Sequence, residues 1–508
     1  MPWLLCWYTA EERSGGDPVS SVSFRAVELR SLAVRCGVDP ARITMARPAE
    51  CASLAEVGAG HAAAPGWVRE AMAGRSGDPT LVPVHFDTDL TTAGRIAQHS
   101  VLLKALLEVW GTGLGLSRCV QATAAASAAR GGTPSDSAEV ATQSFRLCIQ
   151  GIGCKISRDQ QRAAIDALLP VCGMTGEVKM TGAECVLWYI ADRWEAQTLA
   201  HRRRLGKAAA VAVAQPGGST AAGAGAGAEQ PQQQPAPADD FVVFAREVSS
   251  GSRDLLEKMA LSERRYLGPT TMAPATALVT ANLAAIKPGA LVLDPCCGSG
   301  SMLLAAAAIG GAICVGADAN PAVLKGEIDK RRNKGHTPTS NFEQYGLTHL
   351  CAGWATADLT RPPFGAARRQ VFDAVVCDPP YGLREGERSV EAELVGGGST
   401  DLFGALVELA GAVLVGGGRM VYWRPVGVGG DAEAEQKRHE EEASLRERCG
   451  FVEVFRGEVT LSRRLRGHGK KGKGRGKAPK EHGGADYATD REAGRERRHC
   501  VVLEKRKG

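Results

Sequence analysis

Aromatic side chains, long apolar runs, paired cysteines and strong overall charge are all scarce in this 508-residue chain. Aromatics make up only 5% of it, but 44% hydrophobic and 23% charged residues exclude disorder throughout. The longest nearly continuous apolar stretch, residues 302–317, is interrupted by glycines and falls short of the roughly 20 residues that a spanning helix needs. The first residues lack the basic region of a signal peptide. We therefore expect no membrane segment and no export, and about three domains by length.

The fifteen cysteines include no C-x-x-C pair. This spacing gives neither a disulfide framework nor a zinc-ligand pattern. We expect reduced thiols, no bound metal and a cytoplasmic location.

Basic charge is concentrated near the end of the chain. The formal net charge is +5, whereas residues 463–508 hold 16 Lys and Arg against 6 Asp and Glu. Within this stretch, about 467–495 is a basic insert rich in Gly and Lys. It is compatible with an RNA contact through phosphate neutralisation, with a solvated surface, or with a nuclear-localisation signal at 470–480.

The first half of the chain has an α+β pattern. Residues 206–240, rich in Ala, Gly, Gln and Pro, form a low-complexity insert, and 123–138 is a weaker one. Hydrophobic periodicity predicts helices at 29–36, 93–110 and 160–168 and strands at 3–8, 144–149 and 241–248. Small mixed sheets with helices on one face fit this order.

From residue 269 onward, strands and helices alternate. Strands are predicted at 291–293, 312–316, near 354, at 372–377 and at 420–423, with helices at 301–308 and 321–330. A final antiparallel hairpin would pair 451–459 with 500–503 around the basic insert. The alternation predicts an α/β domain with a parallel sheet covered by helices on both faces.

A glycine-containing turn follows the first of these strands. It reads Asp294-Pro-Cys-Cys-Gly298-Ser-Gly300 and lies where a strand ends and a helix begins. Ligands of open α/β sheets bind at this edge, and glycines let a cofactor approach the backbone. The single Gly-x-Gly opened by an acid suits S-adenosylmethionine better than a dinucleotide. A plain glycine-rich turn is the alternative.

Two further acids follow neighbouring strands. Asp318 lies 24 residues after Asp294 at the end of the next strand, where an acid accepts hydrogen bonds from ribose hydroxyls. Its alternative role, helix N-cap, falls to Asn320 at least as well. Asp358 is a candidate acceptor for the adenine amino group, although an acid in a polar loop needs no such role.

The strongest signal is Asp378-Pro379-Pro380-Tyr381 after an apolar strand. Two prolines make the segment stiff and extended, so it presents Asp378 and Tyr381 at the strand's carboxyl end. A carboxylate and a backbone carbonyl that accept both N–H bonds of a nucleobase amine would turn its lone pair toward a methyl donor. Tyr381 would stack on the extruded base. The four residues thus predict methyl transfer to an exocyclic amine; a rigid turn is the alternative.

These motifs resemble those of the tRNA guanine-N2 methyltransferases, specifically the catalytic subunit that acts on guanosine 10. The likeness is close from Leu261 to Gly386 and includes the segments 265–272, 294–300, 341–346, 376–385, 417–425 and 497–505. It implies a class I, Rossmann-like S-adenosylmethionine-dependent methyltransferase domain at 253–508. It further implies an N-terminal α+β, ferredoxin-like domain at 1–85 and a THUMP RNA-binding domain at 86–252.

The resemblance also implies roles for individual residues. The cofactor turn falls on Asp294, Gly298 and Gly300, the ribose acid on Asp318 and the adenine contact on Asp358. The amine-binding motif falls on Asp378, Pro379, Pro380 and Tyr381, and the segment that closes over the cofactor falls on Thr270 and Thr271. Cys296 and Cys297 depart from residues common in the family. The implied partners are tRNA and a small zinc-binding activator protein that covers an apolar edge of the sheet.

Two other functions are compatible with parts of the pattern. The same Asp-Pro-Pro-Tyr motif serves adenine or cytosine amines in other nucleic acids. A non-catalytic THUMP RNA-binding adaptor would need no intact acids at 294, 318 and 378. The RNA-binding resemblance argues against the first, and the intact acids argue against the second.

Overall fold

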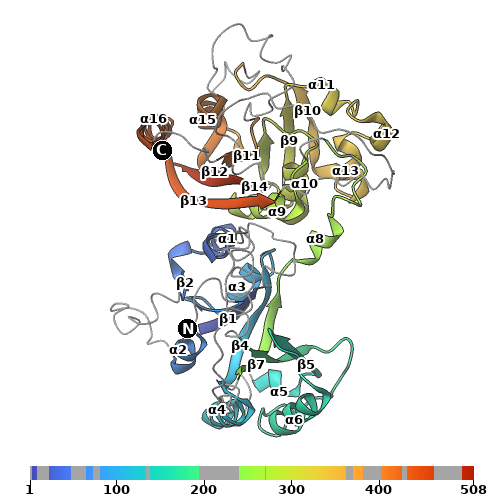
Figure 1. Ribbon diagram of the computed structural model, residues 1–508, viewed down its shortest axis with the longest axis vertical. Helices are drawn as coiled ribbons and strands as arrows, with labels where there is room; N and C mark the ends of the chain where they lie inside the picture. The colour runs from blue at the N-terminus through green and yellow to red at the C-terminus, as the bar shows by residue number, and fades with distance from the viewer. Residues whose placement is uncertain are drawn as a thin grey trace, which may run out of the picture. The chain divides into compact units, whose positions relative to one another are not determined.

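The structure, a computed structural model, describes residues 3–8, 22–46, 65–72, 80–132, 138–193, 240–268, 271–361, 370–380, 402–425, 432–462 and 495–507. The chain forms two compact units (Figure 1). The first comprises Met1–Tyr8, Thr44–Gly94 and Ala105–Ser250; the second comprises Thr9–Ile43, Arg95–Lys104 and Gly251–Gly508. None of the described helices is long and apolar enough to cross a membrane.

The first unit is built on a seven-stranded sheet in the order β2-β3-β1-β4-β7-β6-β5. Its β1–β3, β4–β7 and β6–β7 pairs are antiparallel, and β5–β6 is parallel. The strands are β1 (Trp3–Tyr8), β2 (Ile43–Met45), β3 (Leu81–Phe86), β4 (Leu103–Leu114), β5 (Phe145–Ile152), β6 (Cys185–Asp192) and β7 (Phe241–Ser250). The helices along this part of the chain are α2 (Gly66–Met72), α3 (Leu90–Ala97), α4 (Leu116–Ala129), α5 (Ala138–Thr142) and α6 (Arg158–Leu168). The predicted α+β pattern is confirmed, and the sheet continues across the expected boundary at residue 85.

One sequence prediction in this region is wrong. The helix expected at 93–110 is a short α3 followed by β4, because β4 is buried on both faces and its apolar run imitates helical periodicity. The low-complexity stretch at 123–138 begins inside α4, whose Cys119, Thr123 and Ser127 face inward. Gly111 of β4 allows this helix to approach, since a Cβ there would lie 2.1 Å from Thr123 Oγ1.

The second unit contains the predicted α/β sheet, with strand order β10-β9-β8-β11-β12-β14-β13. The five strands from β10 to β12 are parallel, and β14 and β13 are antiparallel additions at one edge. The strands are β8 (Leu291–Asp294), β9 (Ile313–Asp318), β10 (Cys351–Thr356), β11 (Phe372–Cys377), β12 (Leu414–Pro425), β13 (Phe451–Ser462) and β14 (Arg495–Lys505). The predicted Rossmann-like topology and the final hairpin are confirmed.

Helices and two short 3₁₀ turns complete this unit. The helices are α1 (Val22–Arg35), α8 (Asp254–Lys258), α9 (Pro274–Leu283), α10 (Ser301–Gly310), α11 (Pro321–Leu324), α12 (Lys330–Asn333), α13 (Pro338–Gln344), α15 (Leu402–Val413) and α16 (Ala432–Arg448), and the turns are η3 (Pro40–Arg42) and η4 (Thr348–Leu350). The helix predicted at 321–330 is wrong in extent. It ends at Leu324, because Gly326 adopts φ +69° and any Cβ there would meet the carbonyl oxygen of His336 at 2.2 Å.

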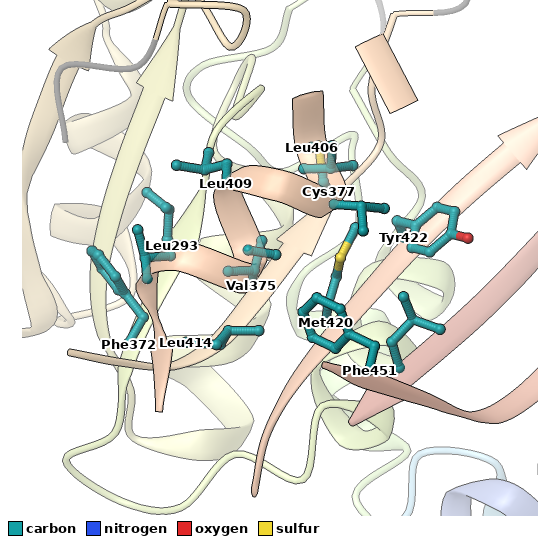
Figure 2. Close-up of a cluster of buried hydrophobic side chains, with 14 of the residues drawn as sticks. Leu293, Phe372, Val375, Cys377, Leu406, Leu409, Leu414, Met420, Tyr422 and Phe451 are labelled. Atoms are coloured by element: carbon teal, nitrogen blue, oxygen red, sulfur yellow. The ribbon is translucent and has the colours of Figure 1, made fainter. Parts of the chain in front are cut away.

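Neighbouring residues of β12 point to opposite faces of the sheet. Trp423 donates a hydrogen bond to Thr280 Oγ1 of α9 at 2.9 Å, on the face that α9 covers. Tyr422 packs on the other face with α15 residues such as Leu406 and Leu409 (Figure 2). The alternation follows from the two-residue period of a strand and places the sheet between helical layers.

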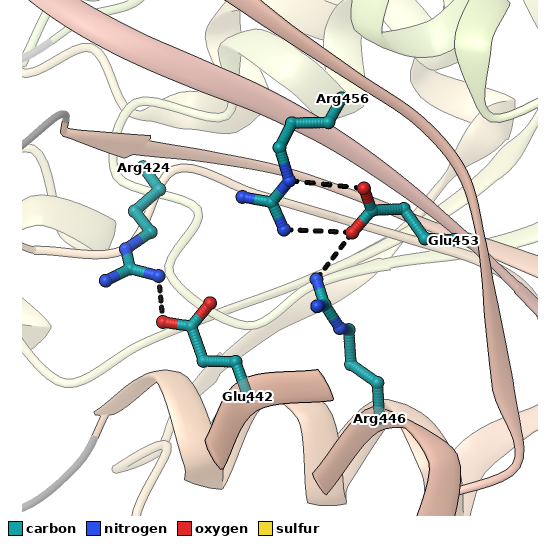
Figure 3. Close-up of polar contacts among 5 residues, drawn as sticks. All are labelled: Arg424, Glu442, Arg446, Glu453 and Arg456. Carbon is teal, nitrogen blue, oxygen red and sulfur yellow. Dashed lines mark hydrogen bonds and ion pairs between the residues drawn. The ribbon is translucent and has the colours of Figure 1, made fainter. Parts of the chain in front are cut away.

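Charged side chains tie α16 to β12 and β13 (Figure 3). Glu453 accepts hydrogen bonds from Arg446 at 2.6 Å and from Arg456 at 3.2 and 2.9 Å. Arg424 pairs with Glu442. Arg446 and Glu442 are each 9% exposed, whereas the Glu453 side chain is 34% exposed. The pairs hold the helix in register with the two strands, and they are only partly shielded from water.

The three-domain division at residues 85 and 252 stays a prediction about which segments fold independently. The second unit includes α1, which packs against α9 and β13 although it lies in the expected N-terminal domain. Buried Glu28 of α1 fixes it by accepting hydrogen bonds from Val101 N at 3.0 Å and Asn282 Nδ2 at 2.8 Å.

Candidate active site

The turn after β8 has the geometry that the sequence predicts. Gly298 and Gly300 adopt φ +52° and +76°, in the left-handed region that glycine favours. Apart from the two chain neighbours of Gly298, no atom of the described residues lies within 4 Å of the position of a Cβ there, so these residues leave the backbone open to a ligand. Gly300 is closed in, since a Cβ would lie 2.8 Å from the Trp354 ring of β10. The two glycines therefore do different work: one gives access, and the other lets the turn pack on β10.

Asp294 is a buried acid at the base of this turn. It is 2% exposed, and its Oδ1 accepts a hydrogen bond from Cys296 N at 3.1 Å. Burial raises the pKa of Asp294 well above its ordinary value, the N–H of Cys296 acts in the opposite direction, and the charges of Asp318 and Asp378 raise the pKa further. The structure thus brings together three of the predicted acids at one edge of the sheet.

Asp318 at the end of β9 is bound to the same turn. Its Oδ2 accepts from Gly298 N at 2.8 Å, and its Oδ1 accepts from Asn320 N at 2.9 Å. The helix N-cap role falls to Asn320, whose Oδ1 accepts from Ala322 N at 3.0 Å. Asp318 is therefore available to a ligand through its remaining lone pairs rather than used as a cap.

Asp358 lies just beyond β10. Ala357 N donates to the Asp318 carbonyl at 3.1 Å, which places this loop beside the end of β9. Asp358 Oδ1 accepts from both the N–H and the hydroxyl of Thr360 at 2.8 Å, as in a local turn. Asp358 Oδ1 therefore serves as an acceptor within its own turn. Asp358 Oδ2 accepts no side-chain or backbone hydrogen bond among the described residues.

Asp378 follows β11 and is held by an arginine that sequence reasoning missed. Arg498 Nη1 of β14 donates to Oδ1 at 2.9 Å and to Oδ2 at 2.8 Å of Asp378. The side chains are 17% and 22% exposed, so the pair is mostly shielded from solvent. Pro379 and Pro380 follow without regular secondary structure, and Tyr381 and Thr270 lie outside the described residues.

A polar chain supports the turn from the segment before α9. Thr271 Oγ1 lies 2.9 Å from Ser299 Oγ, which lies 3.3 Å from Ser301 Oγ, and buried Arg264 donates to Ser301 Oγ at 2.6 Å. The structure therefore places Thr271 against the turn. Sequence analysis assigns no role to Arg264 or Ser299, although both lie in the stretch 261–386 that carries the close family resemblance.

The turn contains a buried thiol, Cys297, and a half-buried one, Cys296. Cys297 fills space beside Gly316, where a Cβ would lie 3.0 Å from its Sγ, and burial raises its pKa well above the ordinary value. Cys296 packs against the cluster of α15 and the sheet. All fourteen cysteines of the described residues are free, and these residues contain no group of three or more His, Cys, Asp or Glu arranged to hold a metal ion.

Residues 262–396 match the sequence model of a family described as RMKL-like, methyltransferase domain. The match begins before α9 and includes the turn after β8 and the end of β11. The matched stretch therefore contains every predicted site residue from Thr270 to Tyr381.

Curated relatives match over 36% of this chain. The tRNA (guanine(10)-N(2))-methyltransferase of Dictyostelium discoideum is 34% identical over 203 residues, which is 38% of its length. That of Gallus gallus is 32% identical over 205 residues, 44% of its length. The aligned stretch thus spans less than half of these relatives. Among solved structures, TrmN from Thermus thermophilus aligns over 99% of both chains at 16% identity, with a TM-score of 0.36.

Proposed function

We propose that this protein transfers a methyl group from S-adenosylmethionine to the exocyclic N2 amine of a guanosine in tRNA, at position 10. The observation that carries the proposal is the position of Asp378. Val375 of β11 pairs with Leu293 of β8, and these parallel strands end at the same edge, beside each other. An amine-binding carboxylate and a cofactor turn are thereby neighbours. The identity of the amine is supported by the names of the curated relatives.

The residues at the turn fit a cationic nucleoside. The backbone at Gly298 is open, and Asp318 and Asp378 place carboxylates beside Asp294. When bound, S-adenosylmethionine supplies an electrophilic methyl group on a positively charged sulfur. We assign Asp318 to the ribose hydroxyls, Asp358 Oδ2 to the adenine amino group, and Thr270 and Thr271 to the segment that closes over the cofactor.

Asp378 holds the amine in this proposal. A carboxylate has about four lone-pair sites, and the two hydrogen bonds from Arg498 use two of them. In this proposal the Asp378 carboxylate also accepts one N–H bond of the amine, while a backbone carbonyl of the Asp-Pro-Pro-Tyr segment accepts the other. The nitrogen lone pair then faces the methyl group, and Tyr381 stacks on the base. Holding two reactants in this way supplies roughly 7 to 11 kcal/mol of the barrier reduction.

We also propose the assembly in which this reaction occurs. The first unit would include a THUMP domain that binds tRNA, and a small zinc-binding protein would cover an apolar edge of the methyltransferase sheet. The fourteen free cysteines fit a reducing compartment, and we place the protein in the cytoplasm.

The test is to identify the methylated base. The full chain is purified from its own cells through an affinity tag, so that bound subunits are retained, and incubated with labelled S-adenosylmethionine and unmodified tRNA. We expect N2-methylguanosine at position 10 by mass spectrometry of nuclease fragments. Methyl groups on adenine or cytosine would overturn the assignment of the base. Cofactor binding by calorimetry without any transfer would support the adaptor function instead.

A further inference from the structure

A loop of the second unit carries unpaired positive charge. Residues 325–336, here called the basic loop, contain five cations and two acids, Glu327 and Asp329. All five cations are exposed, and none of them forms an ion pair among the described residues: Lys325, Lys330, Arg331, Arg332 and Lys334. Asp329 is occupied by the helix terminus, where its carboxylate accepts from Arg332 N at 3.3 Å. The loop therefore presents a net positive surface that the protein itself does not neutralise.

The basic loop is held rigidly. Asp329 and Lys334, which flank α12, have φ of +47° and +50°, and Ala285 is the other non-glycine with positive φ among the described residues. Between them, Asn333 is fully buried; it donates to Leu267 O at 3.0 Å and to Ile328 O at 2.7 Å and accepts from Leu267 N at 3.1 Å. A strained backbone that persists is over-determined by its surroundings, and such segments cluster at functional sites.

Both ends of the loop adjoin the candidate active site. Before it, Val323 O accepts a hydrogen bond from Tyr266 at 2.7 Å, two residues from Gly268, where a Cβ would lie 3.5 Å from Ser299 Cβ of the turn. After it, Pro338 lies against Gly300, where a Cβ would be 3.6 Å from the proline Cβ. Figure 1 shows α11, α12 and α13 gathered beside β9 and β10. Both ends of the basic loop thus lie near the turn after β8, at the carboxyl-end side of the sheet.

We propose that the basic loop binds the phosphate backbone of the tRNA next to the nucleotide that enters the site. This rests on the proposed function. Exposed Lys and Arg side chains bind phosphates and release counterions, and this contact carries no sequence information. A preorganised set of cations on the same side of the sheet as the turn after β8 would fix the register of the RNA, so that Asp378 meets one particular nucleotide.

The test measures tRNA affinity against salt concentration. In the full chain, Lys330→Gln, Arg331→Gln and Lys334→Gln are combined. If each cation binds one phosphate, the negative slope of log K against the logarithm of the salt concentration becomes shallower by roughly 2 to 3. A matched variant, Lys287→Gln, Arg506→Gln and Lys507→Gln, removes the same charge from exposed residues at the opposite, amino-end edge of the sheet and should leave the slope unchanged.

A charge-conserving variant, Lys330→Arg, Arg331→Lys and Lys334→Arg, separates charge from folding. It should keep the wild-type slope, and S-adenosylmethionine affinity should be the same in all variants. An unchanged slope in the neutralised variant, or an equal decrease in the amino-edge variant, would overturn the proposal. Methyl transfer by the wild-type protein is measured separately. Absence of N2-methylguanosine would contradict the proposed function, whereas the salt dependence of tRNA binding still tests the role of the basic loop.

Discussion

Arg498 Nη1 donates hydrogen bonds to both carboxylate oxygens of Asp378, at 2.9 and 2.8 Å, although the two residues are 120 positions apart in the sequence. Asp378 follows β11, and Arg498 lies on β14, opposite Pro425 of the intervening strand β12. A carboxylate held through both oxygens cannot rotate freely about its last bond. Arg498 is therefore a positioning residue for Asp378 in the proposed reaction.

Replacing Arg498 with Met should lower kcat about tenfold to hundredfold, because small misplacements of a reacting group cost rate on this scale. Arg498→Lys should recover part of the loss, since it keeps the charge. KM for S-adenosylmethionine should stay within about twofold in both variants. The measurement is steady-state methyl transfer to tRNA, with Arg506→Met as a control on an exposed arginine. Equal loss of cofactor binding in Arg498→Met would mean a merely structural role.

Gly300→Ala should weaken cofactor binding and stability more than Gly346→Ala does. Both glycines have positive φ, +76° and +70°, so Ala costs about 1 to 2 kcal/mol at either position. Only at Gly300 would the new Cβ meet the Trp354 ring, at 2.8 Å, and overpacking adds about 1 to 3 kcal/mol. Thermal unfolding and calorimetric titration of the two variants test this. Equal changes in unfolding temperature and in cofactor affinity for the two variants would show that the turn accommodates the added Cβ without cost.

Asp294→Asn should change how stability depends on pH. The folded pKa of Asp294 lies well above its ordinary value because of burial, so the folded protein binds a proton that the unfolded chain releases. That contribution is complete below the unfolded pKa and is lost as pH rises through the folded pKa, at up to about 1.4 kcal/mol per pH unit. The unfolding free energy of wild type minus that of Asp294→Asn should therefore decrease as pH rises. A constant difference would contradict this.

Glu453→Gln should destabilise the second unit by about 1 to 2 kcal/mol, because it leaves Arg446 and Arg456 without their shared anion (Figure 3). Glu447→Gln is the control, since its contact with Arg506 is 3.9 Å long and its side chain is 74% exposed. Urea unfolding of both variants provides the measurement. A Glu453→Gln variant as stable as the control would show that the network contributes nothing.

The sequence predicts the α/β sheet well, because β8, β9 and β11 are short apolar runs that have an acid as the last residue or directly after it. Local patterns carry this information, so Asp294, Asp318 and Asp378 could be predicted as a set. The strand β4 could not be predicted, since burial on both faces removes the alternation that marks a strand.

Contacts that depend on strand order and strand register could not be predicted from the sequence. Arg498 meets Asp378 only through the order β11-β12-β14, and Asn333 meets Leu267 only after Gly326 ends α11. The arginines of the segment 497–505 could have indicated a contact with an acid of the site, because this strand returns to the site edge of the sheet. The partner of Arg498 could not be named before the pairing was known.

The most direct test of the account is Asp378→Ala, measured for cofactor affinity by calorimetry and for methyl transfer to tRNA in the same preparation. Asp358→Ala is the matched acid, which should weaken cofactor affinity and leave kcat nearly unchanged. We expect Asp378→Ala to bind S-adenosylmethionine about as well as wild type and to transfer no measurable methyl. Turnover near the wild-type rate would contradict the assignment of Asp378 to the amine.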